Sequence, residues 1–200
     1  MLRTTLPADT AAVSALVDQW RDLAGSAGST GTVTTPLISA TRTAASAALA
    51  ADWLSRDRPR PPRTGFFGAG LIARYIHTFL AGTGWSFEEI GVHDLSAAHA
   101  AGFRGYLEQS GAAGRITVHD SAEQLIRASD LVIFATVAGE PHVTQPAWFA
   151  HNPLVLHVSL RDLAPQILLA SASIVDDVDH CLKASRRASP RPRRAGGSRA

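Results

Sequence analysis

The sequence has little of several features, and each shortage excludes a class of protein. Cysteine occurs once, at position 181, so the chain can form neither an internal disulfide framework nor a zinc site built on cysteines. No run approaches the roughly 18 apolar residues needed to span a bilayer. No N-terminal stretch has the pattern of a signal peptide. We therefore expect a cytoplasmic protein with no membrane partner.

Acidic residues are absent from the last 18 positions, and this distorts the overall charge. Those positions hold seven Lys and Arg, whereas residues 1–182 hold 12 Lys and Arg against 17 Asp and Glu, a net charge of −5. A sequence pI of about 9.2 therefore describes the tail and not the rest of the chain. We predict no nucleic-acid partner, because the main part of the chain offers no broad basic face.

The same C-terminal stretch also lacks large aliphatic and aromatic side chains. Residues 185–200 cannot bury enough surface to offset the entropy lost on ordering, which predicts a disordered basic tail. Two other interpretations stay open. The tail could be an arm that binds nucleic acid or membrane, or it could be an out-of-frame translation product, because GC-rich codons give Ala, Arg, Pro and Gly in any frame.

Metal-binding and hydrolase patterns are also missing. The eight histidines are scattered, and only His93 and His99 flank a common turn, so we predict no metal site. Ser159, Asp162 and His157 could be assembled into a triad, but the sequence around Ser159 is not a nucleophile elbow.

What is present divides the chain into four parts. Apolar residues at helical spacing predict a helix over 9–23, and a linker rich in Gly, Ser and Thr follows it. A second helix over 42–55 leads to a proline-rich break. The predicted parts are residues 1–36 (N-terminal helix and linker), 37–62 (a helix connecting from a substrate domain), 63–184 (a cofactor-binding domain) and 185–200 (the tail).

Beyond the prolines, short apolar runs alternate with helical segments, which is typical of a parallel sheet covered by helices. Residues 130–135, with the sequence DLVIFA, are apolar on both faces, as an interior parallel strand must be. We predict strands near 64–67, 89–93, 115–118, 130–135, 154–158 and 173–175, and helices near 70–81, 96–109, 121–128, 162–170 and, more briefly, 145–150. The fold class is α/β, a doubly wound parallel sheet of the Rossmann type, with a remnant of a second domain for substrate binding and dimerisation.

The motif that carries chemistry lies where the first of these strands meets its helix. Gly68 can make the tight turn, Gly70 lets a pyrophosphate approach the backbone, and Ala73 lets the helix pack on the sheet. Asp94 ends the next strand 24 residues after Gly70, close to the spacing expected for the acid that binds the adenosine ribose. An ordinary glycine-rich turn, and a helix-capping role for Asp94, are the structural alternatives.

These features predict a dinucleotide site that favours NAD over NADP. A carboxylate at Asp94 hydrogen-bonds a free 2′-hydroxyl and repels a 2′-phosphate, and no arginine follows it. Thr136 and Val137 end an interior strand on the carboxyl edge of the sheet, where such cofactors bind, and Gly139 leaves room beside them. The predicted cofactor-binding residues are Gly68, Ala69, Gly70, Leu71, Ile72, Asp94, Thr136 and Val137.

Four segments, in order and spacing, resemble the ornithine cyclodeaminase/mu-crystallin family: RTAASAALA at 42–50, GFFGAG at 65–70, ATV at 135–137 and VSLRDLAP at 158–165. The resemblance covers about residues 37–184. Within the family, the strings VHD, FATVAGEPHV and SLRDLAP look most like the branch that makes 2,3-diaminopropionate for siderophores and antibiotics. That branch implies an NAD-dependent dehydrogenase that converts N-(2-amino-2-carboxyethyl)-L-glutamate to 2,3-diaminopropionate and 2-oxoglutarate.

The resemblance also implies roles for two residues. Arg42 matches the family arginine that binds the substrate carboxylate, a task that suits a planar bidentate donor. Asp162 matches the family aspartate beside the reacting amine carbon, and is the predicted catalytic residue. The alternatives are that Arg42 lies on a solvated helix face and that Asp162 caps the helix near 162–170.

Two departures from the family pattern limit this interpretation. Family members carry a longer segment ahead of the RTAA helix that forms a substrate and dimer domain and supplies a lysine to the site, whereas the only lysine here is Lys183. The arginine-rich tail also stands where the family chain returns to that domain. We therefore expect an enzyme truncated at both ends, with a small amino-acid-derived substrate, that would form a homodimer if the substrate domain were complete. Ornithine cyclodeamination, a non-catalytic NAD-binding module and an inactive remnant are the alternative functions.

Overall fold

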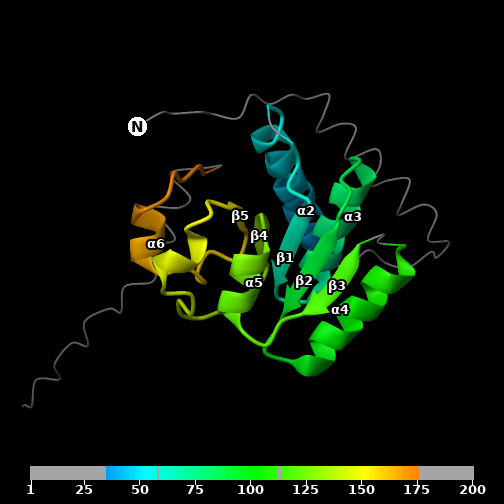
Figure 1. The fold of residues 1–200 in the computed structure, drawn as a ribbon. Coiled ribbons are helices and arrows are strands. Elements are labelled where there is room, and N and C mark those ends of the chain that lie inside the picture. Colours follow the sequence, from blue (N-terminus) through cyan, green and yellow to red (C-terminus); the bar gives the residue numbers. More distant parts are fainter. Residues whose placement is uncertain (1–34, 58, 112–113, 176–200) are drawn as a thin grey trace, which may run out of the picture.

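The computed structural model describes residues 35–57, 59–111 and 114–175, and these form a parallel sheet with helices on both faces (Figure 1). The five strands lie in the order β3-β2-β1-β4-β5, all parallel. This confirms the predicted α/β fold of the Rossmann type. The elements in chain order are α2 (Thr35–Leu54), β1 (Arg63–Phe67), α3 (Leu71–Gly82), β2 (Glu89–His93), α4 (Ala97–Gln109), β3 (Arg115–Val118), α5 (Ala122–Ala128), β4 (Leu131–Phe134), the 3₁₀ turn η1 (Pro146–Phe149), β5 (Leu154–His157) and α6 (Pro165–Leu169).

The central strands β1, β2 and β4 are buried on both sides of the sheet, and β4 shows how its sequence achieves this. Leu131 and Ile133 point into the core beneath α2, α3 and α4, whereas Val132 and Phe134 point into the core beneath α5 and α6. Because successive side chains of a strand face opposite sides, a strand covered on both faces needs an unbroken apolar run. The prediction from the DLVIFA sequence is therefore confirmed. Because helices cover both faces of the sheet, a ligand site is expected at its carboxyl edge, where β1, β2, β4 and β5 end.

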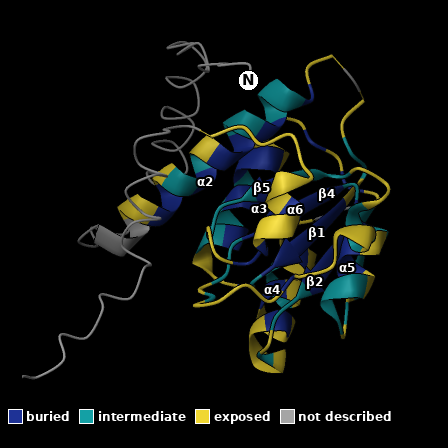
Figure 2. Cartoon of the chain, turned by 90° about the vertical axis from the view of Figure 1, so that its left-hand side faces the viewer, coloured by how far each residue is buried: buried dark blue, intermediate teal, exposed yellow. Residues whose placement is uncertain are grey.

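Helix α2 lies beside α3 (Figures 1 and 2), and its buried face is a stripe of alanines. Ala44, Ala48 and Ala51 are completely buried, at the spacing that places them on one helix face. The indole Nε1 of Trp85, just beyond the end of α3, donates to Asp52 Oδ1 near the end of α2 at 2.6 Å. Both helices thus end at the amino edge of the sheet and run in the same direction, so the first half of α2 lies toward the carboxyl edge.

Several predicted boundaries needed correction. Helix α2 begins at Thr35, seven residues before the prediction, and the helix predicted over 162–170 is confined to Pro165–Leu169. The strand predicted at 173–175 is wrong: residues 171–175 form no strand and are exposed. β-branched residues such as Ile174 favour a strand only where a neighbouring strand and a buried face are available.

Other expectations fall outside the described residues. The helix predicted at 9–23, nearly all of the linker and the tail at 185–200 are among them. In the part of the chain that the structure describes, no helix combines the length and apolar character needed to cross a membrane.

Candidate dinucleotide site

The glycine turn between β1 and α3 has the backbone geometry that the motif predicts. Gly68 has φ of +83°, and a Cβ there would lie 2.6 Å from the carbonyl oxygen of Ala135, so this position excludes any side chain. Its N–H donates to His93 O at 3.0 Å, which continues the pairing of β1 with β2. The chain therefore turns sharply between the ends of β2 and β4.

Gly70 precedes α3 and faces open space. A Cβ on Gly70 would meet no atom within 4 Å, and no side chain caps the N-terminus of the helix. Unsatisfied N–H groups at the start of a helix, with its positive dipole end, attract an anion such as a pyrophosphate. Because Gly70 has no side chain and no side chain caps the helix, this turn has room for an anion such as a pyrophosphate.

The other predicted residues of the motif divide between core and surface. Ala69 and Ala73 are buried, and Ala73 packs into the core beneath α3, as expected of the third position of the motif. Leu71 is exposed and Ile72 is half-buried beside the turn. The helix is therefore held against the sheet by alanine while its first residue remains accessible.

Asp94, at the carboxyl end of β2, is bonded directly to the glycine turn. Its Oδ2 accepts a hydrogen bond from Ala69 N at 2.8 Å, and its Oδ1 accepts one from Ser96 N at 2.8 Å. The alternative capping role belongs instead to Ser96, whose hydroxyl accepts from His99 N at the start of α4. Each Asp94 oxygen keeps a further lone pair, so the carboxylate can hold the turn and still accept from a ligand hydroxyl.

On the other side of the turn, Thr136 leads to a buried carboxylate. The Thr136 hydroxyl donates to Asp162 Oδ1 at 2.5 Å and accepts from Ala138 N, while Val137 beside it is fully exposed. Because the Gly68 Cβ position lies 3.2 Å from Thr136 Cα, this cluster adjoins the glycine turn. The structure thus brings together the predicted residues from the ends of β1, β2, β4 and β5.

Asp162 itself has no exposed surface and both of its oxygens are occupied. The Ser159 hydroxyl donates to Oδ2, and His157 Nε2 lies 3.2 Å from the same oxygen. Burial raises the pKa of Asp162, but hydrogen bonds with His157, Ser159 and Thr136 outweigh it and lower the pKa to about 2. The carboxylate is therefore ionised at neutral pH, and it does not cap α6, which begins at Pro165 after Ala164.

Arg42 lies on the exposed face of α2, in the half of the helix that points to the carboxyl edge. Among the described residues, no hydrogen bond or ion pair joins it to Asp162. Its predicted contact with a substrate carboxylate stays a prediction.

Sequence reasoning missed His142 and the way in which His157 and Ser159 contact Asp162. His142 Nε2 lies 3.7 Å from Asp162 Oδ1, and its side chain is 39% exposed. The hydrolase triad that the sequence argued against is not formed, because Ser159 bonds to the aspartate and not to a histidine. A histidine in a loop carries no sequence signal for such a position, since the contact depends on how two loops 20 residues apart meet.

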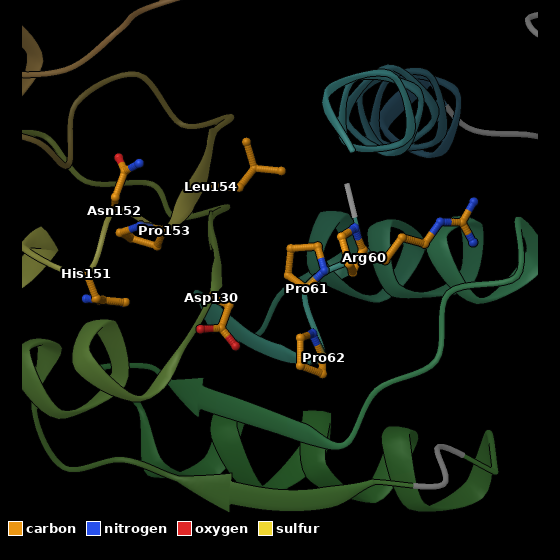
Figure 3. A pocket seen from close by; sticks show the side chains of 9 residues that line it. Arg60, Pro61, Pro62, Asp130, His151, Asn152, Pro153 and Leu154 are labelled. Atoms are coloured by element: carbon orange, nitrogen blue, oxygen red, sulfur yellow. The ribbon is translucent and has the colours of Figure 1, made fainter. Parts of the chain in front are cut away.

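A separate pocket of about 250 Å³ lies on the opposite edge of the sheet (Figure 3). Its lining includes Pro62, Asp130 and Pro153, each of which precedes a strand. Asp130 is paired there with Arg63 through two hydrogen bonds of 2.7 and 2.8 Å. In doubly wound sheets ligands bind at the carboxyl edge, so the glycine turn, and not this pocket, is the candidate site.

Comparison with known proteins places this site in a family. Residues 27–155 match the model of the ornithine cyclodeaminase/mu-crystallin family. No curated protein matches the chain.

Solved structures support the same placement. The crystal structure of CmnK is 29% identical with a TM-score of 0.62, covering 74% of this chain and 43% of that one. A Thermococcus litoralis Δ1-pyrroline-2-carboxylate reductase in complex with NADH and L-proline is 26% identical with a TM-score of 0.55, covering 66% and 41%. The Paracoccus denitrificans iminosuccinate reductase in complex with NAD⁺, at 16% identity and a TM-score of 0.62 over 74% and 48%, shares the fold.

This chain spans less than half the length of each of these structures. Its family match nevertheless covers more than half of its own residues, including the glycine turn, Asp94 and Thr136. On this match, the chain belongs to the ornithine cyclodeaminase/mu-crystallin family.

Proposed function

We propose that this chain binds NAD at the glycine turn and belongs to an oxidoreductase that acts on a small amino-acid-derived substrate. The observation that carries the proposal is the bond from Ala69 N to the Asp94 carboxylate. This bond joins the glycine turn after β1 to the acidic residue at the end of β2, the two parts of the dinucleotide-binding motif. Support comes from the family match and from the NADH complex of a similar reductase.

The two sides of the turn suit the two ends of the dinucleotide. Asp94 follows β2 and offers a carboxylate to the adenosine ribose, whereas Thr136 and Val137 follow β4 on the side where the nicotinamide half binds. The open N-terminus of α3 lies between them for the pyrophosphate. An anionic Asp94 disfavours a 2′-phosphate, so NAD is preferred over NADP.

When bound, NAD supplies a hydride acceptor at its nicotinamide ring. The chain's own residues would hold that ring against the Thr136–Asp162 cluster. Arg42, on the half of α2 near the carboxyl edge, would bind the substrate carboxylate in a bidentate manner.

Within the family we propose N-(2-amino-2-carboxyethyl)-L-glutamate as the substrate, oxidised to 2,3-diaminopropionate and 2-oxoglutarate in siderophore or antibiotic precursor biosynthesis. The support is the resemblance of FATVAGEPHV and SLRDLAP to that branch. The structure adds that these two segments contact each other, through backbone bonds from His142 N and Val143 N to Asp162 O.

A second candidate is a non-catalytic NAD-binding module. The observation that favours it is the match of residues 27–155 to a family model that also describes mu-crystallin. Conversion of ornithine to proline and ammonia is the alternative reaction within the family.

Isothermal titration with NAD and NADP, followed by an NADH absorbance assay with each amino-acid substrate, separates these proposals. Tighter binding of NAD and reduction of NAD only with the carboxyethyl-glutamate substrate would support the proposed reaction. NAD binding without turnover of any substrate would favour the module, and tighter binding of NADP would contradict the role of Asp94.

A further inference from the structure

The half of the site that would hold the nicotinamide contains a buried carboxylate and an accessible imidazole side by side. Asp162 follows β5 and contacts Thr136 after β4, next to Gly68. His142 lies in the loop between β4 and η1, with Nε2 3.7 Å from Asp162 Oδ1. Hydride transfer takes place at the nicotinamide, so a group that moves the accompanying proton should be in this cluster and open to the substrate.

Asp162 meets the first requirement but not the second. None of its surface is exposed, and its oxygens accept from Thr136 and Ser159 and contact His157. A proton donor or acceptor must come within hydrogen-bond distance of the reacting group or act through one water. A carboxylate enclosed by three side chains is suited to orienting a neighbour.

His142 meets both requirements. Its side chain is 39% exposed, and its position is set by the backbone, because His142 N and Val143 N both donate to Asp162 O at 3.0 Å. Val143 pairs with Leu163 in a short parallel bridge, and both are buried, which holds the two loops together. A separation of 3.7 Å is long for a hydrogen bond, but catalytic hydrogen bonds often shorten when substrate binds.

Few other groups face His142. Asp162 faces it from the loop after β5, and the ring of Phe67 from β1 lies 6.2 Å from its ring. His157 shares the Asp162 carboxylate, while Glu140 on its own loop and Arg161 next to Asp162 are exposed to solvent.

We propose that His142 is the catalytic residue that exchanges a proton with the substrate nitrogen. In this proposal Asp162, for which the family resemblance predicts the catalytic role, is instead a positioning residue that orients His142. The inference rests on the proposed function and deepens it. In the oxidative direction, the substrate Cα–H bond breaks and its electron pair leaves as hydride to NAD⁺. An N–H bond of the amine breaks, its electron pair forms the C=N bond of the imine, and the proton passes to His142.

The first test uses the full chain and does not depend on turnover. Diethyl pyrocarbonate modifies accessible histidines, and mass spectrometry measures the modification of each one with and without saturating NADH. We expect NADH to slow modification of His142 severalfold and to leave His151, at the amino edge of the sheet, unchanged. Equal modification of His142 with and without bound NADH would overturn the proposal.

The second test measures the reaction in His142→Gln and in the matched control His151→Gln. General acid–base catalysis contributes about 10²–10⁴-fold, so kcat should fall by that order in His142→Gln while NADH affinity and KM change little. Imidazole in solution should restore activity to His142→Ala. Undiminished kcat in His142→Gln would overturn the inference but leave the proposed function intact. Failure of the unmodified chain to bind NADH would refute the proposed function itself.

Discussion

Replacing Gly68 and Gly70 by alanine, one at a time, should separate the folding role of the glycine turn from its binding role. At Gly68 the backbone has φ of +83°, which costs an alanine about 1–2 kcal/mol. The added Cβ would also lie 2.6 Å from Ala135 O, a contact that forces β1 and the end of β4 apart. Overpacking of this kind costs about 1–3 kcal/mol more. We expect Gly68→Ala to lower the free energy of unfolding by about 2–5 kcal/mol.

Gly70→Ala is the matched control, two residues away on the same turn. Its φ of −81° suits any residue, and its Cβ would meet no atom within 4 Å. Alanine is a poorer residue than glycine at the start of a helix, so the loss of stability should stay below about 1 kcal/mol. The same methyl group would occupy the space where the pyrophosphate approaches α3, and NAD affinity should fall about tenfold or more, equivalent to about 1.4 kcal/mol.

Urea unfolding followed by circular dichroism gives the stability of both variants, and isothermal titration gives their NAD affinity. A typical domain is stable by about 5–15 kcal/mol, so the Gly68 variant should still show a measurable transition. Our reasoning about the turn would be refuted if Gly68→Ala were as stable as the unmodified chain. Unchanged NAD affinity in a well-folded Gly70→Ala would show that the pyrophosphate does not approach this backbone.

Three further outcomes follow from the titratable groups. Asp94→Asn should lose about tenfold or more in NAD affinity and discriminate less against NADP, because the negative charge near the 2′-position is gone; unaltered selectivity in titrations would contradict this. Hydrogen bonds hold the pKa of Asp162 at about 2, below its usual 3.8, so its stabilising contribution is full above about pH 4 and is lost as the pH falls toward 2. Asp162→Asn should therefore destabilise the chain less at pH 2 than at pH 7 in urea unfolding, and an equal loss at both would refute it. Burial lowers the pKa of His77 from 6.5 to about 4, so as the pH falls the unfolded chain takes up this proton before the folded chain does. The free energy of unfolding should therefore fall by up to about 3 kcal/mol between pH 6.5 and 4. His77→Gln should reduce this fall.

The sequence predicted most of the sheet because the strands carry their own signals. β2 and β3 occupy the predicted residues, 89–93 and 115–118, and β4 differs by one residue at each end. Helix α2 was predicted to start too late because Thr, Ser and Gly around position 35 look like a linker. Pro36 was the available signal, since proline favours the first turn of a helix.

Contacts between residues distant in the sequence could not be predicted from local patterns as the strands were. The motif spacing was enough to place Asp94 beside the glycine turn, because the ends of neighbouring parallel strands meet at one edge. Nothing in the spacing shows that Asp162 contacts Thr136, or that His142 lies beside it, because those contacts depend on the bridge between Val143 and Leu163. Loop residues are positioned by such bridges and carry no periodic pattern.

Binding and turnover should consequently be separable properties of this chain. The proposed cofactor contacts come from the ends of β1, β2 and β4, and the bond from Ala69 N to Asp94 fixes the geometry of the turn within one domain. The proposed substrate contact is made by Arg42, which is carried by α2 and not by a strand end. Since α2 is held to α3 mainly by small alanines, changes that loosen this contact should affect substrate affinity before they affect NAD affinity.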